Sequence, residues 1–504
     1  MKKLSIVFIW VAVLSLSSCS KKTPEFVHSI PDDAIAVVSL NPMQIHTKSK
    51  INTFASIKEK VKNEVWGAII EDPLSTGLDV NEYAFVFFRM EDDKPIIGVT
   101  AGMKDQKKFE ATLSRIHEGV TDEFETNDVY TWVQPDKQGI IAWNNKQMII
   151  LASPDNDEFE TSFFTGSLDK MFNPVREESL TSLVDFKDFL GKMKDLNLWV
   201  SSDEMFNILE KMGGDKIPDI PVTLYNNYAQ VYVEFANGAI NVNGETHFSE
   251  EVEKNIEEVL VMKPELNEQM LELAPGGNLL LAVAGSMDLA KLQKLVEKFA
   301  PPEIDSVGNK IEKATGMNIK DLLASVSGDF TIAINGVEGE SMIPIEVFLG
   351  IGVNGKALQE KLMETVEGMA PVEEDGTFFI INIQGNEIYS GIVNDVLVIT
   401  NAKGYKDALK DGTFSPPLKS SRFGDFADGS VGVFVNLDMD EYPALVQGLI
   451  SQKPERKQWV ERLTDPFDYI GISAGNYKNR IVVKTSDPGE NSLYTVMKMI
   501  AIPE

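Results

Sequence analysis

Short apolar runs bounded by turn residues recur along the chain and predict β-strands. They come mostly as adjacent pairs: Tyr83–Phe88 is followed by Ile96–Thr100, and Phe330–Ile334 by Ile345–Gly350. Pairs of short runs with a turn signal between them are typical of antiparallel hairpins. The pattern therefore predicts sheets that are largely antiparallel.

Single segments with helical spacing interrupt these strand pairs. Phe109, Leu113 and Ile116 fall on one stripe, and Ser249 is a plausible N-cap for a helix that joins two parts of the chain. A second stripe consists of Leu358, Leu362, Val366 and Met369. Strands in pairs with occasional amphipathic helices indicate an α+β fold rather than regular βαβ winding.

The same order of landmarks occurs twice, about 240 residues apart, which is the pattern of an internal repeat. Ile30–Ala34 leads into the run Ile35–Leu40, and Ala274–Asn278 leads into Leu279–Ala284. Further matches are Thr76–Val80 with Thr315–Ile319, Asn145–Leu151 with Asn394–Thr400, and Phe186–Phe189 with Phe423–Phe426. We expect two homologous halves, residues 26–262 and 263–504, each a mostly antiparallel sheet with amphipathic helices.

Each predicted half closes with a strand pair. The turn in the first half is Asn237-Gly238, a strong two-residue turn signal. The matching turn in the second half is predicted at Lys478-Asn479.

The first 25 residues are typical of a targeting segment rather than of a folded domain. Lys2 and Lys3 precede an apolar run, Leu4–Leu16, which is shorter than the roughly 20 residues of a membrane-spanning helix. The run ends in Leu-Ser-Ser before Cys19, which resembles the lipobox of bacterial lipoproteins. That resemblance implies a signal peptide over residues 1–18, lipidation of Cys19 and a tether over residues 19–25. The alternative is an ordinary secretory signal with a chance cysteine.

The residues after Cys19 bear on orientation. Surface-exported lipoproteins of the Bacteroidetes type tend to carry acidic residues there, whereas this chain has Ser20, Lys21 and Lys22. We therefore expect an outer-membrane lipoprotein that faces the periplasm.

Composition narrows the possible partners. The formal net charge is −30, which disfavours nucleic-acid binding because an acidic body repels phosphate backbones. The same charge repels anionic lipids, so the expected membrane contact is the N-terminal lipid and not a basic patch. Cys19 is the only cysteine of 504 residues, so an internal disulfide is impossible.

The segment Ile30–Pro42, "IPDDAIAVVSLNP", together with Lys48-Ser49-Lys50 after the lipobox and tether, resembles a group of Bacteroidetes lipoproteins known as domain of unknown function 4836. The resemblance would cover nearly the whole mature chain. It implies no activity, so no functional residues follow from it.

Gly350–Gly355, "GIGVNG", matches the glycine pattern of dinucleotide sites. The fingerprint also requires an acidic residue at the end of the next strand, but the run Thr377–Ile383 ends in Gln384. We interpret the glycines as a strand-to-helix turn.

No other local motif predicts a cofactor, a metal ion or a nucleophile. His28, His46, His117 and His247 lack metal-ligand spacing. The acidic stretches Pro154–Glu160 and Asp438–Glu441 lack the EF-hand pattern, so a solvated loop and a helix start are favoured over calcium sites.

Three aromatic residues are candidates for a binding surface. Tyr130 and Trp132 share one face of a strand-like run, and Trp143 lies on the next run. Exposed rings could stack on a sugar or on a partner's apolar side chains, whereas buried rings would only fill the core.

With no catalytic motif, a binding or scaffolding role is the favoured hypothesis, with an envelope protein or a glycan as the partner. The alternative is a hydrolase of envelope polysaccharide or peptide whose carboxylates are assembled by the fold. Two buried carboxylates that face each other across a cleft would favour the alternative.

Overall fold

The computed structural model describes residues 23–57, 72–116, 123–154, 158–202, 227–250, 252–254, 260–299, 312, 316–337, 344–411, 416–452 and 454–501. The chain divides into two compact units. Unit 1 comprises Met1–Thr47 and Ile51–Met205, and unit 2 comprises Lys48–Lys50 and Phe206–Glu504. Among the described residues, no helix has the length and apolar character needed to cross a bilayer.

Unit 1 contains one antiparallel sheet in the order β4-β5-β6-β7-β3-β2-β1-β8. Its strands are β1 (Ala36–Leu40), β2 (Ala84–Glu91), β3 (Lys94–Gly102), β4 (Glu125–Thr126), β5 (Thr131–Asp136), β6 (Gly139–Trp143), β7 (Gln147–Ala152) and β8 (Leu196–Ser201). Its helices are α2 (Pro42–Ser49), α5 (Gln106–Ile116), α6 (Thr161–Phe172) and α7 (Val184–Lys192), with short 3-10 turns at Glu25–Ser29, Ile51–Thr53, Pro73–Ser75, Arg176–Glu178 and Leu180–Ser182.

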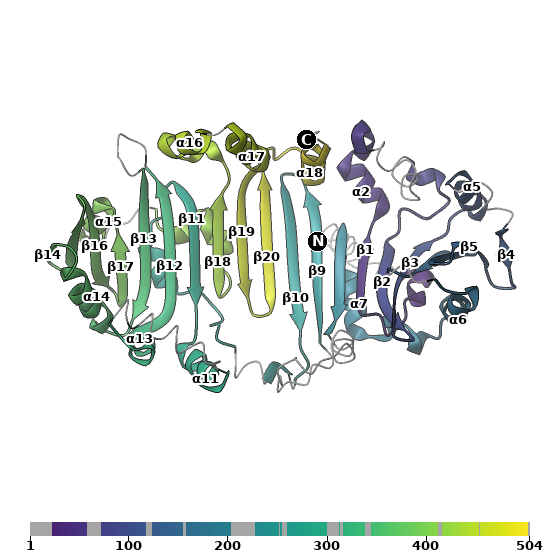
Figure 1. Cartoon of the computed structure of the whole chain (residues 1–504), viewed down its shortest axis with the longest axis horizontal. Coiled ribbons are helices and arrows are strands. Elements are labelled where there is room, and N and C mark those ends of the chain that lie inside the picture. Colours follow the sequence, from purple (N-terminus) through teal and green to yellow (C-terminus); the bar gives the residue numbers. More distant parts are fainter. Residues whose placement is uncertain are drawn as a thin grey trace, which may run out of the picture. The chain divides into compact units, whose positions relative to one another are not determined.

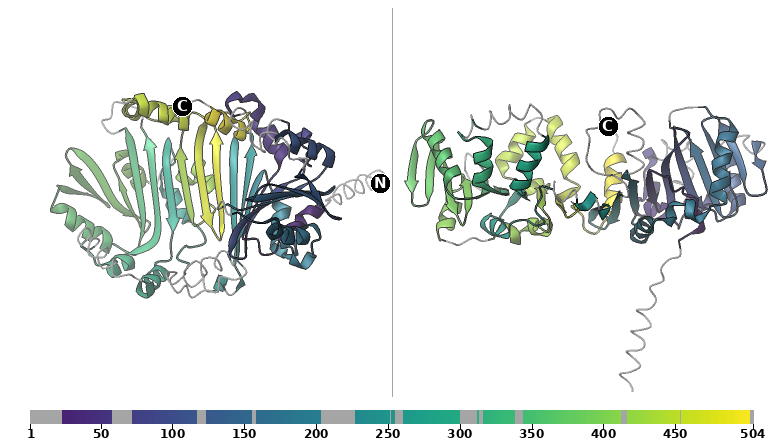
Figure 2. Two further views of the ribbon diagram at one scale, coloured as in Figure 1. Left: turned by 45° about the vertical axis from the view of Figure 1, so that its right-hand side comes forward. Right: turned by 90° about the horizontal axis from the view of Figure 1, so that it is seen from below.

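Unit 2 contains a longer antiparallel sheet in the order β9-β10-β20-β19-β18-β11-β12-β13-β17-β16-β15-β14. Its strands are β9 (Tyr228–Ala236), β10 (Ala239–His247), β11 (Leu279–Ser286), β12 (Val326–Gly336), β13 (Ile345–Val353), β14 (Val372–Asp375), β15 (Phe378–Ile383), β16 (Asn386–Val393), β17 (Val396–Thr400), β18 (Val431–Asn436), β19 (Phe467–Gly475) and β20 (Lys478–Thr485). Figure 1 labels these strands except β15, and the left view of Figure 2 shows the central strands side by side.

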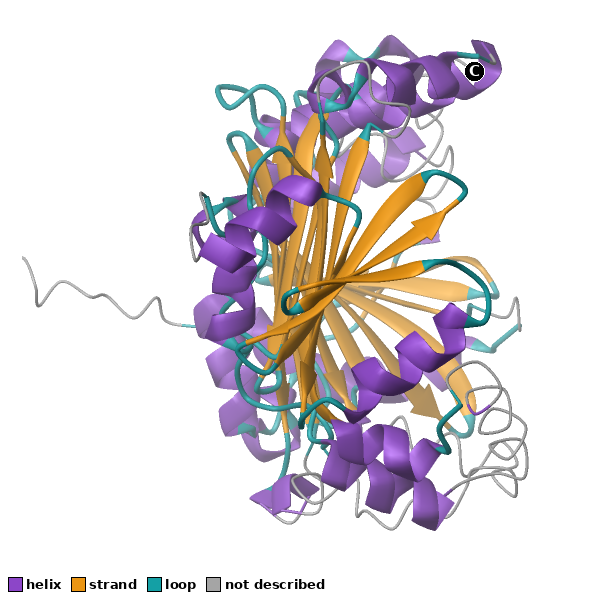
Figure 3. Ribbon diagram, turned by 90° about the vertical axis from the view of Figure 1, so that its left-hand side faces the viewer, coloured by secondary structure: helices purple, strands orange, loops and turns teal. Residues whose placement is uncertain are grey.

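The helices of unit 2 are α10 (Glu268–Leu273), α11 (Leu289–Phe299), α13 (Ile319–Ser325), α14 (Ala357–Glu367), α15 (Lys403–Asp411), α16 (Ala444–Ser451), α17 (Pro454–Thr464) and α18 (Ser492–Ala501). Short 3-10 turns lie at η8 (Leu418–Ser420), η9 (Arg422–Phe426) and η10 (Met439–Glu441). Figure 3 shows helices beside the strands and at their ends, so that helices and strands are segregated. The predicted α+β class with largely antiparallel sheets is confirmed.

Strand order in the two units corresponds element by element. β5-β6-β7-β3-β2-β1-β8 in unit 1 parallels β15-β16-β17-β13-β12-β11-β18 in unit 2. In unit 1, β3 pairs with β7, the strand that precedes α6. In unit 2, β13 pairs with β17, the strand that precedes α15. A duplication predicts such a correspondence, and the homology of the halves stays a prediction.

The compact units divide the chain before the predicted repeat boundary at residue 262. The reason is that β9 and β10, which fall in the first predicted half, belong to the sheet of unit 2, where β10 pairs with β20. The fourth residue of β10, Val242, faces the fourth residue of β20, Ile481. Equivalent positions of the two closing hairpins therefore lie opposite each other.

The turns of these hairpins differ in one detail from expectation. Gly238 has φ +73°, as the predicted Asn237-Gly238 turn requires. The second hairpin turns at Asn476 and Tyr477, with φ of 48° and 62°, rather than at Lys478-Asn479. Two successive positive φ values are typical of a type I′ turn, whose twist matches that of the flanking strands.

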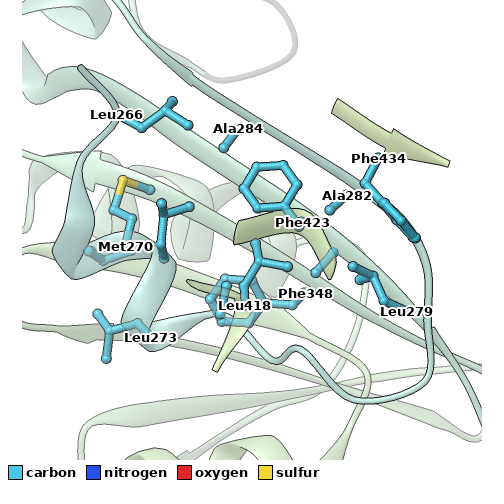
Figure 4. Packing of buried hydrophobic residues seen from close by; sticks show 14 of the residues in the cluster. Leu266, Met270, Leu273, Leu279, Ala282, Ala284, Phe348, Leu418, Phe423 and Phe434 are labelled. Carbon is cyan, nitrogen blue, oxygen red and sulfur yellow. The ribbon is translucent and has the colours of Figure 1, made fainter. Parts of the chain in front are cut away.

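The core of unit 2 lies between the sheet and the segments that cross it. Figure 4 shows Leu418 and Phe423, from η8 and η9, between Met270 of α10 and Phe434 of β18. Phe348 of β13 is fully buried in the same cluster. The predicted stripe on α14 is only partly used: Leu358 is buried, whereas Met369 lies beyond the helix end and is 82% exposed.

Candidate functional site

The three aromatic candidates lie in unit 1, on and next to the β5–β6 hairpin. Trp143 is fully buried: its ring lies edge-on to Phe109 and Phe124, and its Nε1 donates to Glu110 Oε1 at 3.0 Å. Tyr130 is also buried and stacks on Phe172. Neither ring offers a face to a ligand, so the core-filling alternative holds for both.

Trp132 is the candidate that keeps partial exposure. It lies on β5, where its ring is 5.5 Å from that of Tyr130, centroid to centroid. Cys19, the predicted lipidation site, lies outside the described residues, as does the predicted signal peptide. The sequence candidates therefore do not come together into one site.

A small pocket of about 160 Å³ in unit 1 is lined by His28, Asp33 and Arg89, among others. Its charged groups are engaged with the protein: Arg89 Nη2 is 3.1 Å from Asp33 Oδ2. His28 Nδ1 is 2.6 Å from Thr181 Oγ1. Burial, reinforced by the charge of Arg176, lowers the pKa of His28, so the imidazole is neutral at pH 7. A cavity of this size holds at most a small molecule of about the size of benzene.

Unit 2 has two larger, open pockets of about 410 and 500 Å³ that share Ser327 and Asn354. We call them the paired polar pocket. The first is also lined by Asn267, Gln269, Asp329, Gly352, Val353, Gly355, Asn394, Asp395 and Val396. The second is also lined by Lys263, Asp288, Leu289, Ala290, Gln293, Leu323, Ala324 and Val326. Amide, hydroxyl and carboxylate groups are therefore concentrated where the two pockets meet.

Glycine makes the wall between the two pockets possible. The β12–β13 pairing is irregular between Val326 and Phe330, and Gly328 in this stretch has φ +91°. A Cβ on Gly328 would lie 2.1 Å from the carbonyl oxygen of Met287, and one on Gly352 would lie 2.0 Å from Ser327 Oγ. A side chain at Gly352 would fill the space beside Ser327, and one at Gly328 would collide with the backbone of Met287.

The irregular stretch turns Asp329 into the wall, where it is 6% exposed. Its Oδ1 accepts from Lys263 Nζ at 2.9 Å and from Ser286 Oγ at 2.8 Å. Its Oδ2 accepts from Ser327 Oγ at 2.8 Å and from Asn267 Nδ2 at 3.3 Å. A buried carboxylate with four donors has no acceptor capacity to spare for a ligand.

Burial opposes ionisation of Asp329, but the hydrogen bonds from Lys263, Ser286, Ser327 and Asn267 outweigh it and lower the pKa of Asp329. A carboxylate that is ionised and fully hydrogen-bonded is a weak base. Ser327 donates to this weak base, so the arrangement does not activate its hydroxyl as a nucleophile. Asp329 instead holds the pocket wall in place.

The groups that remain for a ligand surround this wall. Asn354 is exposed, and its Nδ2 donates to Ala324 O at 3.1 Å and to Val326 O at 3.0 Å, so its side-chain oxygen is not used by these two bonds. Asn394 and Asp395 form the exposed β16–β17 turn, with φ of 49° and 59°. The pocket thus presents amide and carboxylate groups from two turns to one open space.

The hydrolase alternative would be favoured by two buried carboxylates that face each other across a cleft. Among them, Asp195 and Asp329 are the only buried carboxylates, and each lies in a different unit. Neither described unit therefore contains a facing pair of buried carboxylates. The Gly350–Gly355 motif is also explained: Gly350 lies inside β13, and the strands after α14 form the antiparallel pair β14–β15. The pocket residues Asn394 and Lys263 were missed in the sequence because no local motif marks them, whereas Asn354 lies within the Gly350–Gly355 stretch that we interpreted as a strand-to-helix turn.

Comparison with known proteins identifies the family to which the sequence matches. A family model described as "Domain of unknown function (DUF4836)" matches residues 26–493. No protein with a curated description matches the sequence. Two solved structures, of crystal forms I and III of TP0453, match with a TM-score of 0.28 and 9% identity each. The form I match covers 46% of this chain and 81% of that chain, and the form III match covers 49% and 90%.

Proposed function

We propose that this chain, which belongs to the DUF4836 family, is a lipid-anchored, non-enzymatic binding protein of the bacterial cell envelope that holds a glycan in the paired polar pocket. The observation that carries the proposal is the wall at Asp329. The Asp329 carboxylate accepts four hydrogen bonds, is neutralised by Lys263, and has the amide groups of Asn267 and Gln269 in the same pocket lining. Amides that both donate and accept, together with carboxylates that accept, suit the hydroxyl and acetamide groups of a neutral sugar.

The charged residues of the pocket lining favour an uncharged ligand over an anion. Asp395 is exposed at one side of the space, and Lys263 is paired with Asp329 and donates to Ser327 O at 3.0 Å. An anionic ligand would meet a carboxylate and no uncommitted cation from the described lining. This argument favours glycan over phosphate-bearing ligands.

The binding test uses the N-acetylglucosamine trimer as the probe, with affinity measured by calorimetry. Asn394→Gly removes the side-chain amide at the pocket and keeps a residue that tolerates positive φ, so the turn survives. We expect affinity to fall about 3- to 10-fold, the value of one net hydrogen bond.

The matched control is Asn476→Gly, the same change at φ 48° in the β19–β20 turn, which lines neither pocket. It should leave affinity unchanged. If both variants weaken binding equally, or if the trimer does not bind the unchanged protein, the pocket is not a site for such a glycan.

The cellular location is a separate part of the proposal. Lipidation of Cys19 would place the protein on the outer membrane, facing the periplasm. We expect Cys19→Ala to move the protein from the salt-washed membrane fraction to the supernatant, because the acyl chains are lost. Retention of the variant in washed membranes would show that another element provides the anchor.

A further inference from the structure

The small pocket of unit 1 is built by segments that are far apart in the sequence and fixed to one another. It is lined from the turn Glu25–Ser29, the segment 31–33, strand β2, helix α6 and the segment 174–178. α6 packs on the Glu25–Ser29 turn. Asp32 N donates to Glu178 O at 3.2 Å, which ties the two loop segments together. The pocket is therefore a feature of the folded unit and not of a single loop.

Three titratable side chains of the pocket are already held by the protein. Arg89 is 15% exposed, and its Nη2 pairs with Asp33 Oδ2. Arg89 makes no other hydrogen bond or ion pair within the described part of the chain, so its guanidinium keeps N–H donors that the protein does not use. His28 contacts Thr181 Oγ1, and burial lowers the pKa of His28, so it adds no charge at pH 7.

Three further charged side chains of the lining are exposed: Asp32, Lys170 and Glu178. Among the residues that the structure describes, none of these three side chains makes a hydrogen bond or an ion pair. Lys170 therefore neutralises neither carboxylate, although all three groups line one pocket of about 160 Å³. The pocket holds uncommitted charges of both signs.

The mixture of signs persists when the surrounding charges are counted. The lining carries two cations against three carboxylates. Groups that act on His28 or accept from Ser167 add two basic and two acidic side chains, which are Arg176, Lys187, Glu25 and Glu91. Because neither sign dominates, a simple anion or a simple cation would meet like charges in this space.

The rest of the lining is largely apolar and the space is small. Its apolar residues are Pro31, Met171, Pro174 and Val175. A cavity of about 150 Å³ accommodates benzene, and alanine has the same number of non-hydrogen atoms as benzene. Apolar walls with a few polar groups that fix the orientation are typical of small-molecule sites.

We propose that this pocket binds a small zwitterion of the size of a short-chain α-amino acid. The ligand carboxylate would accept from Lys170 and from the donors that Arg89 retains, and the ligand ammonium would donate to Asp32 and Glu178. A ligand that is neutral overall but charged at both ends uses the groups of both signs without bringing like charges together. The site lies in unit 1, so it does not depend on the glycan pocket of unit 2.

The test is a calorimetric titration of the mature chain, residues 19–504 with Cys19→Ala, with alanine, each enantiomer separately. Two analogues of nearly the same size are compared: lactate, in which a hydroxyl replaces the ammonium, and alaninamide, which lacks the carboxylate. We expect each analogue to bind at least about 10-fold more weakly, because each loses a hydrogen bond between charged groups. Binding of neither enantiomer, or an analogue that binds as well as alanine, overturns the proposal.

The variant Lys170→Gln assigns the binding to this pocket. It should weaken alanine binding about 10-fold and leave the affinity for alaninamide unchanged, since alaninamide has no carboxylate for Lys170 to pair with. The matched control is Lys107→Gln, at an exposed lysine of α5 that lies outside the pocket lining. It should bind alanine as the parent chain does. Equal loss in the two variants, or no loss in Lys170→Gln, would rule this pocket out as the site.

Discussion

Replacing Asp329 with asparagine is expected to lower the free energy of unfolding of unit 2 by about 3 kcal/mol. The carboxylate is 6% exposed and accepts from four donors, including Lys263. Asparagine would set an NH2 group against two of these donors and leave the Lys263 ammonium, which is 34% exposed, without its counter-charge. Urea denaturation, with hydrogen exchange of the β12 amides as a local probe, measures the loss.

The control for this prediction is Asp395→Asn, the same change at an exposed position that lines the same pocket. Its effect should stay within about 0.5 kcal/mol. A loss of similar size in both variants would mean that the Asp329 hydrogen bonds do not stabilise the unit.

The same carboxylate gives a pH dependence with a definite sign. The pKa of Asp329 is lower in the folded chain than in the unfolded chain, where it is about 3.9. Its stabilisation is therefore fully present above about pH 4 and is lost as the pH falls through the folded pKa. The difference in stability between the parent chain and Asp329→Asn should shrink in acid.

Replacing Trp143 with alanine is expected to destabilise unit 1 by about 3–5 kcal/mol, the usual cost of deleting a large buried aromatic side chain. The ring contacts Phe109 and Phe124, and its loss also leaves Glu110 Oε1 without one of its two donors. A shift of the denaturation midpoint, together with faster hydrogen exchange in β6, reports the effect.

Trp459→Ala is the matched comparison, because Trp459 is 65% exposed. We expect it to change stability by no more than about 0.5 kcal/mol. If Trp143→Ala were equally mild, and weakened ligand binding instead, Trp143 would belong to a binding surface after all.

Local patterns in the sequence were sufficient for the secondary structure. The run Tyr83–Phe88 overlaps strand β2, Ile96–Thr100 lies within β3, and the stripe at Phe109 and Leu113 is the buried side of α5. These predictions succeed because strand alternation, helical spacing and turn residues act between near neighbours. The rejected dinucleotide motif at Gly350–Gly355 could be judged on the same local grounds.

The candidate sites required long-range contacts. Lys263, Ser286 and Asp329 meet only because β11 and β12 pair and the β12 irregularity turns the carboxylate inward. The sequence could not decide which rings are exposed either: Trp143 and Trp459 are the same residue type, yet one is fully buried and the other 65% exposed. Exposure depends on what packs over a residue from elsewhere in the chain.

By itself, the sequence determined the α+β class, the antiparallel pairing of neighbouring strands, the family and the absence of an internal disulfide. Only the tertiary structure decided that β10 joins β20 and that two pockets meet at Ser327 and Asn354, beside Asp329. The physical reason is the separation along the chain of the residues that interact. Turns and periodicity are fixed by residues a few positions apart, whereas burial, pocket shape and local charge are fixed by segments brought together across the sheet.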